Sequence, residues 1–495
     1  MRSVLRAVGV FAGLALVSPM GLMADGQSPE PAKAASQDNA LQDRLDRLQA
    51  LVEQQQQTIE ELESKLNLAG STDWNAARIE EIKKVVREVM ADAEFRESLY
   101  PDVVQVGYEN GFYIKSSDEA FLLRIQGMLQ VRWTGTNRQT DNPRVQGRQR
   151  QDDINGFEIE KLFLTFAGHI HTDKLTYQIT VMGDTDLDHD WTSYYAFVNY
   201  EIVEEFQIQA GIMDIPQGRQ FLTWDSHLQF VDRSMAEEVF CLGQSVGVMA
   251  HGTLAKRLSY MVGVFNGINN PTDSPSREQL DTNFAYAARL VGHLLGSGID
   301  DETDLAFSKD PLLDVGLSFY YNDDNGDENG PRLLYSIPDR IRAGRGIGGN
   351  ADTDATGTDY FGFGADIAFR YRGFSITAEW FLRTVDGDSK YSQWELLTGH
   401  SGATHLQGGY IQAGYFIVPK KVEVAARIGG IWDNEDDNTW EYTFGVNYYP
   451  FGSHNFKIQA DFTRIEEAPM YSNWINVNQN DEINMFRVQL QAAFE

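Results

Sequence analysis

The sequence predicts an all-β fold, a 16-stranded antiparallel transmembrane β-barrel that follows an N-terminal periplasmic coiled-coil and helical segment. Three observations lead to this prediction. Apolar and polar residues alternate with a period of two in many segments after residue 112. The connections between these segments alternate between short turns and long loops. No run of eighteen apolar residues occurs, so the sequence predicts no transmembrane helix after export.

The segment 121–133 shows the alternation most clearly. One parity is apolar with an aromatic residue at each end: Phe121, Leu123, Ile125, Gly127, Leu129, Val131 and Trp133. The other parity is largely polar and cationic: Leu122, Arg124, Gln126, Met128, Gln130 and Arg132. Alternate side chains of a strand point to opposite faces, so this strand has one apolar and one polar face. Because a soluble sandwich strand alternates in the same way, the prediction depends on how often the pattern recurs.

The pattern recurs in sixteen segments: 121–133, 157–170, 174–182, 191–200, 206–213, 245–252, 258–265, 284–292, 313–322, 360–371, 374–383, 407–417, 422–431, 440–449, 456–463 and 484–494. The connections 171–173, 201–205, 253–257, 372–373, 418–421 and 450–455 are short, whereas 134–156, 214–244, 266–283, 323–359, 384–406 and 464–483 are long. The connection 293–312 is an exception, because it is longer than its turn position predicts. Lipid leaves no backbone polar group unpaired, so such a sheet must close. Sixteen strands are enough for a water channel, and their even number puts both barrel ends in the periplasm.

The first hundred residues predict export and oligomerisation. Residues 1–24 have the basic, apolar and small-residue order of a signal peptide, with a short buried helix as the alternative. A flexible linker at 25–40, a coiled coil at 41–68 and a helical segment at 73–100 precede a barrel domain at 112–495. The coiled coil rests on an unbroken heptad pattern: Leu41, Leu45, Leu48, Val52, Gln55, Ile59, Leu62 and Leu66. A single amphipathic helix packed on the barrel is the alternative to oligomerisation.

Composition excludes several function classes. The net charge of −31 argues against a nucleic-acid partner, which needs a basic face. Cys241 is the only cysteine, so we expect neither an intramolecular disulfide nor a cysteine metal site. The acidic run 184–190 lacks the glycine and glutamate of a calcium loop, and the preferred interpretation is an acidic loop tip that is either repelled by neighbouring charges or bridged to lipopolysaccharide. No histidine has a catalytic spacing, so we predict no enzyme, no catalytic residue, no metal and no cofactor.

An ordered set of short motifs resembles the phosphate-selective porin O and P family. They are GFEI at 156–159, AGIMDIPQGRQFL at 210–222, FVDRS at 230–234, VGV at 246–248, FNG at 265–267, GFS at 373–375, AEW at 378–380 and GVNYY at 445–449. The resemblance covers roughly residues 112–495 and implies a homotrimeric, sixteen-stranded porin. It also implies that the third extracellular loop, here 214–244, folds into the lumen and narrows it. Barrels of this kind usually end in an aromatic residue. This sequence departs from that pattern, because Phe494 is the penultimate residue and Glu495 is the last.

The predicted function is an outer-membrane porin of a Gram-negative-type cell, through which small anions diffuse passively, with phosphate selectivity as the narrower prediction. Two alternatives stay open: a general or differently selective porin for cations or small solutes, and a barrel with a coiled coil that tethers the envelope. A barrel lipase would need a Ser–His pair at the lipid-facing rim, and the pattern offers none.

Parity also predicts which charges line the pore. The predicted wall cations are Arg124, Arg132, Lys161, Lys174, Arg289, Arg370, Arg383, Arg427, Lys457 and Arg487. The constriction loop adds Arg219 and Arg233, together with His227 and Trp224. Arginine suits phosphate because its fork donates two hydrogen bonds at once. An equal alternative is that Arg219 and Arg233 pair with Asp225, Asp232 or wall carboxylates and only hold the loop in place.

Overall fold

A computed structural model describes Lys84 and residues 104–139, 153–183, 191–268, 284–324, 358–387, 404–432, 438–467 and 482–495. The predicted signal peptide, linker and coiled coil lie outside the described residues, as do the predicted helical segment apart from Lys84 and the acidic run 184–190. No helix in the described part is long and apolar enough to cross a membrane.

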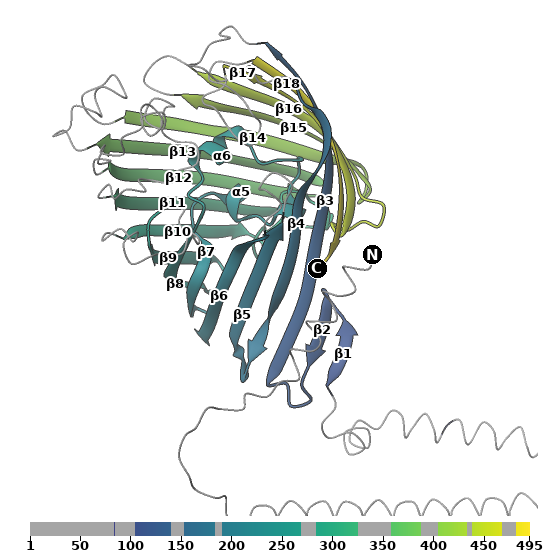
Figure 1. The fold of residues 1–495 in the computed structure, drawn as a ribbon, viewed down its shortest axis with the longest axis vertical. Helices are drawn as coiled ribbons and strands as arrows, with labels where there is room; N and C mark the ends of the chain where they lie inside the picture. The colour runs from purple at the N-terminus through teal and green to yellow at the C-terminus, as the bar shows by residue number, and fades with distance from the viewer. Residues whose placement is uncertain are drawn as a thin grey trace, which may run out of the picture. The chain divides into compact units, whose positions relative to one another are not determined.

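The described strands β3 to β18 form a closed antiparallel barrel (Figure 1). They are β3 (Phe121–Gln139), β4 (Asn155–Ile170), β5 (Thr172–Gly183), β6 (Trp191–Val203), β7 (Phe206–Asp214), β8 (Gln244–Leu254), β9 (Leu258–Phe265), β10 (Ala285–Leu295), β11 (Leu312–Asp324), β12 (Thr358–Tyr371), β13 (Phe374–Gly387), β14 (Thr404–Val418), β15 (Val422–Trp432), β16 (Thr439–Tyr448), β17 (Phe456–Glu466) and β18 (Glu482–Phe494). Each strand pairs with the next, and β18 returns to β3 with Glu482 opposite Gln139 and Phe494 opposite Gly127. The predicted sixteen-stranded barrel is confirmed, and every predicted segment overlaps one of these strands.

A short hairpin precedes the barrel and was not predicted. It consists of β1 (Gln105–Tyr108) and β2 (Phe112–Lys115). β2 pairs with β3 just beyond the end of β18, with Phe112 opposite Ile125. The Phe112 and Phe494 rings lie edge to face at 5.8 Å, so the hairpin contacts the last residue of β18 next to the seam, where β18 pairs with β3 and closes the barrel. Strands of four residues carry too few alternations for the pattern to reveal them.

The two faces of the wall follow the predicted parity. On β12, Phe361 and Ile367 point outward with 43% and 46% of their surface exposed, whereas Arg370 points inward and is 2% exposed. On β18, Phe486 and Leu490 face outward, and Arg487 is buried inside. The outer face is therefore apolar, as a lipid-facing wall requires, and the polar parity lies in the barrel interior.

Among the connections that the structure describes in full, two fold into the interior. The connection 215–243 joins β7 to β8 at the end that carries the long loops, and we call it the constriction loop. It contains α5 (Arg219–Leu222), η1 (Asp225–His227) and α6 (Met235–Phe240). The connection 296–311 joins β10 to β11 at the opposite end, which carries the short turns, and we call it the inner turn.

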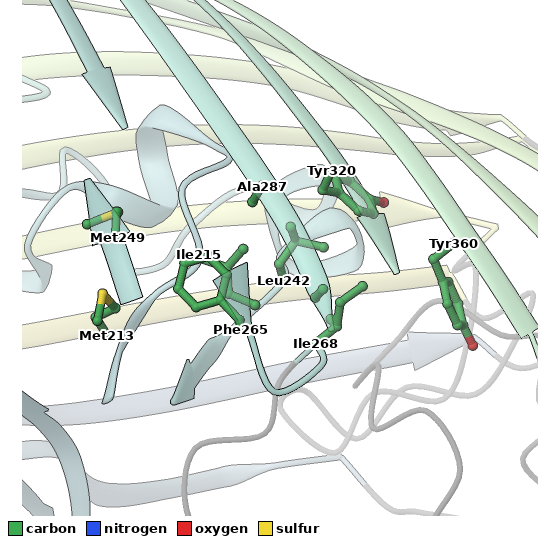
Figure 2. Close-up of a cluster of buried hydrophobic side chains, with 10 residues drawn as sticks. Met213, Ile215, Leu242, Met249, Phe265, Ile268, Ala287, Tyr320 and Tyr360 are labelled. Carbon is green, nitrogen blue, oxygen red and sulfur yellow. The ribbon is translucent and has the colours of Figure 1, made fainter. Parts of the chain in front are cut away.

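Three apolar clusters pack these connections against the wall. The first joins Ile215 and Leu242, at the two ends of the constriction loop, to Ile268 in the connection after β9 and to inward-facing residues of β7 to β12 (Figure 2): Met213, Met249, Phe265, Ala285, Ala287, Tyr320 and Tyr360. The second packs α6 on apolar residues of distant strands, namely Phe381, Ile431, Ile465, Ile483 and Met485. The third joins Leu305 of the inner turn to Phe416 and Tyr449. Burial of this apolar surface fixes where both connections lie inside the barrel.

Candidate pore constriction

Backbone groups of the constriction loop bond to side chains of many wall strands. The Val231 amide donates to Asp461 of β17 at 3.2 Å, and the Met235 amide donates to Glu441 of β16 at 2.7 Å. Asn447 of β16 donates to the Gln229 carbonyl at 2.7 Å. Polar side chains that face the interior thus replace the water that a free loop would bind.

The wall carboxylate of Glu379, on β13, holds the start of α5. Its two oxygens accept the backbone amides of Arg219 and Gln220 at 2.6 and 2.7 Å, and the Tyr410 hydroxyl donates to it at 2.6 Å. These amides have no partner within so short a helix, so the carboxylate satisfies donors that would otherwise be lost.

Asp232 of the constriction loop lies between two predicted pore arginines. It accepts from Arg132 of β3 at 2.6 Å and from Arg487 of β18. Arg487 also binds Asp461 through two nitrogens, at 2.8 and 2.9 Å. Burial opposes ionisation of Asp232, but the two guanidinium groups outweigh it and lower the pKa of this carboxyl. A buried network of charges therefore attaches the loop to both β3 and β18, the two strands whose pairing closes the barrel.

Arg427 and Arg383 bind the second half of the loop. Arg427 pairs with Glu441 at 2.7 Å and donates to the carbonyls of Asp232 and Arg233. Arg383 is fully buried; it donates to Tyr320 at 2.6 Å and to the last carbonyls of α6 at 3.1 and 2.6 Å. The carbonyl end of a helix carries partial negative charge, which offsets part of the Arg383 charge.

Arg219 and Arg289 share one wall carboxylate. Arg219 donates to Asp366 of β12 at 2.7 Å, and Arg289 of β10 lies 2.6 Å from the other Asp366 oxygen. Arg289 also donates to the Gln217 carbonyl at 2.5 Å. Arg219 further donates to the Ile299 carbonyl of the inner turn at 3.0 Å.

Arg233 and Lys161 meet at Asp225. Arg233 donates to Asp225 at 2.8 Å, and Lys161 of β4 binds the same oxygen. Burial would raise the pKa of Asp225, but Arg233 and Lys161 lower it well below its usual range. The ion pairs that the sequence left as an alternative for Arg219 and Arg233 are thus present, since each binds a carboxylate.

Arg370 and Lys457 bind backbone carbonyls. Arg370 of β12 donates to the Asp301 carbonyl of the inner turn at 3.1 and 2.7 Å. Lys457 of β17 is fully buried and donates to the Leu228 carbonyl of the constriction loop at 2.8 Å. Both cations lie near the short-turn end of the barrel, where Arg370 supports the inner turn and Lys457 supports the constriction loop.

Two predicted pore cations differ from the others, Lys174 and Arg124. Lys174 is exposed near the start of β5 and has no ion pair among the described residues. Arg124 lies half-buried on β3 near the short-turn end, opposite Ala167 of β4 and Tyr113 of β2. Its buried Nε has no hydrogen-bond partner within the described ranges, and no ion pair joins it there to a carboxylate. Arg124 and Lys174 are thus the predicted pore cations that have no ion pair in the described part of the chain.

Irregular pairing turns two unpredicted side chains inward. The register of β3 with β4 shifts between Lys161 and Ile159, so Glu160 is the extra residue, and it reaches Arg132 at 3.0 Å. A similar shift in β6 makes Tyr194 extra, and its ring lies 4.7 Å from that of the inward-facing Tyr195. A bulge adds a residue that simple parity assigns to the wrong face, so period-two counting could not place either side chain.

The inner turn meets the constriction loop inside the barrel. Glu302 of the inner turn accepts from the Gln220 side chain at 2.7 Å and from the Gln229 amide at 2.6 Å. Nearby, His227 of the loop contacts His454, which binds Asp301 at 2.7 Å. Burial and His454 lower the pKa of His227 to about 4. The sequence marked this turn only as unusually long, and its length is what lets it reach the loop.

One acidic side chain of the loop is buried without a partner. Glu237 of α6 has no exposed surface, and neither of its oxygens has a hydrogen-bond partner among the described groups. Burial and the Glu379 carboxylate raise the pKa of Glu237 well above its usual range, because both disfavour its charged form. In the part of the chain that the structure describes, no group of three or more His, Cys, Asp or Glu side chains is placed to hold a metal.

Comparisons with known proteins agree with this architecture. A family model described as phosphate-selective porin O and P matches residues 133–494. No curated protein matches the chain.

Several solved structures are similar in fold. OmpT, an outer-membrane protein of Vibrio cholerae, is 11% identical with a TM-score of 0.48, and the match covers 76% of this chain and 98% of that one. The outer-membrane channel DcaP of Acinetobacter baumannii is 11% identical with a TM-score of 0.45, and the match covers 77% and 99%. OmpF of Salmonella typhi is 10% identical with a TM-score of 0.47, and the match covers 78% and 100%.

Proposed function

The chain belongs to the phosphate-selective porin O and P family, and from this premise we propose that it forms a water-filled channel for passive diffusion of small anions, phosphate among them. Family and barrel fold together make it an outer-membrane porin. The observation that supports the anion preference is Arg124, an inward-facing guanidinium with a buried Nε that the described residues leave without a partner. The other predicted pore cations, Lys174 aside, contact protein groups instead: Arg132, Lys161, Arg219, Arg233, Arg289, Arg370, Arg383, Arg427, Lys457 and Arg487.

Ion selectivity of the purified protein tests this proposal. In planar bilayers under a salt gradient, the sign of the reversal potential reports whether anions or cations pass more easily. We expect an anion-selective sign for the native protein and a shift towards cations for Arg124→Gln, because the variant removes a charge that faces the solute. Arg464→Gln is the matched control, since Arg464 lies on the outward parity of β17 and pairs with Glu466 at 2.7 Å. A cation-selective native channel would exclude the anion proposal, and added phosphate should reduce the chloride current if the narrower proposal holds.

A specific observation favours a differently selective porin as the second candidate. Near Arg132, the carboxylates of Glu158 and Glu160 keep 30% and 11% of their side-chain surface exposed. Exposed carboxylates attract cations and repel anions. If this candidate holds, Glu158→Gln will weaken cation preference, whereas Arg124→Gln will leave the reversal potential unchanged.

Assembly and partners are further parts of the proposal. The heptad pattern from Leu41 to Leu66 supports a homotrimer, and the apolar outer wall supports contact with lipid and lipopolysaccharide. Deletion of residues 41–99 separates an oligomerising role from an envelope tether: loss of trimers on native gels supports the first. Intact trimers that lose their attachment to the cell wall would support the second.

A further inference from the structure

We propose that Glu495 is a positioning residue for the pore constriction, and that it acts through Trp224. Glu495 directly follows β18, and its Oε2 accepts a hydrogen bond from the Trp224 indole nitrogen at 3.0 Å. Trp224 belongs to the constriction loop and immediately precedes η1, so this bond joins the barrel seam to the loop.

The Glu495 carboxylate lies among interior groups and not in bulk water. Its second oxygen, Oε1, is buried and has no hydrogen-bond partner within the described ranges. A carboxylate that has lost part of its hydration depends on the hydrogen-bond donors that the protein supplies. The Trp224 N–H group is such a donor, so its bond keeps the Glu495 side chain in place.

Trp224 in turn sets the position of an aromatic cluster on the interior wall. Its ring centroid lies 5.1 Å from that of Phe163 on β4 and 6.0 Å from that of Tyr195 on β6. Tyr194 extends the cluster, at 5.0 Å from Phe163. Ring packing restrains the indole laterally, but only its N–H group gives a directional contact with the barrel seam.

The loop residues after Trp224 have separate attachments. Lys161 and Arg233 bind Asp225, and Gln491 of β18 donates to the Ser226 carbonyl at 3.2 Å. Loss of the Glu495 bond should therefore free Trp224 and its neighbours without releasing the whole loop. The inference deepens the proposed channel function, because it concerns the same constriction.

Hydrogen exchange tests the inference without any need for conduction. In detergent micelles, Glu495→Ala should speed exchange of amides in residues 223–228 by roughly tenfold, the effect of losing one charge-assisted hydrogen bond. Glu495→Gln keeps an acceptor oxygen, so it should restore near-native exchange, whereas Trp224→Phe removes the donor and should reproduce the alanine result. Glu482→Ala is the matched control, because Glu482 starts the same strand and pairs with Arg464 at 3.1 Å.

Single-channel recording gives the functional counterpart. Glu495→Ala and Trp224→Phe should both increase open-channel current noise, and the double variant should add nothing to either one. The inference is overturned if Glu495→Ala exchanges at the native rate, or if Glu495→Gln behaves like the alanine variant. A native protein that does not conduct would contradict the proposed function and leave the exchange result as the measure of this inference.

Discussion

Single side chains show how the interior charges are used. Parity predicted which residues face inward, but it could not predict their partners, because Arg132, Asp232 and Arg487 are far apart in sequence. Most of the predicted pore cations bind the constriction loop, the inner turn or a wall carboxylate. Their contact with anions stays a prediction, and Arg124 and Lys174 are the two that have no ion pair among the described residues.

Loss of the Asp232 charge should weaken loop attachment. Asp232→Asn removes a negative charge that neutralises Arg132 and Arg487 in a buried site. Breaking such a buried ion pair costs about 3–5 kcal/mol. We expect a lower unfolding temperature in micelles, read from the heat-dependent shift of the barrel on gels. Asp173→Asn, in the short turn region, is the control and should leave the temperature unchanged.

The His227 contact should depend on pH. Burial, His454 and Lys457 disfavour the protonated form of His227, whereas Asp301 favours that form. The net effect lowers the pKa of His227 from 6.5 to about 4. As pH falls, His227 in the unfolded chain takes up a proton at a higher pH than His227 in the folded chain. The free energy of unfolding is therefore at its full value above the unfolded pKa and decreases as pH falls towards the folded pKa. We expect a loss of about 1–3 kcal/mol between about pH 7 and about pH 4. His227→Gln should lose this part of the pH dependence, and an unchanged pH profile would contradict the contact.

Individual elements show where sequence patterns are strong and where they fail. Every predicted strand is present, since period-two alternation reports one buried and one exposed face directly. The register shifts at Glu160 and Tyr194 were missed, because an extra residue inverts parity locally. The inward path of the inner turn was also missed, since it depends on contacts such as Glu302 with Gln220 that no local pattern encodes.

The apolar face of α6 should be required for loop docking. Phe240 is fully buried and stacks on Phe381 of β13 with 5.4 Å between ring centroids. Phe240→Ala should destabilise this contact by about 3–5 kcal/mol, and Phe240→Leu by less. Protease cleavage within 219–241 on folded protein measures the effect, and cleavage no faster than in the native protein would show that α6 is held by other contacts.

At the scale of the whole molecule, the closed barrel encloses two described connections, the constriction loop and the inner turn, which meet inside it. The closing pairing of β18 with β3 needs no residue of the constriction loop, and the lumenal cations can be hydrated once the loop is absent. The barrel should therefore be able to close without the constriction loop. The central claim is that residues 215–243 narrow the channel.

Conductance of a loop-replaced barrel tests this claim most directly. A short Gly-Ser linker would replace residues 218–241, and correct folding would be checked by the heat-dependent gel shift. Single-channel conductance in symmetrical salt should then rise several-fold above that of the native protein, because the constriction is removed. A folded variant whose conductance equals the native value would contradict the account.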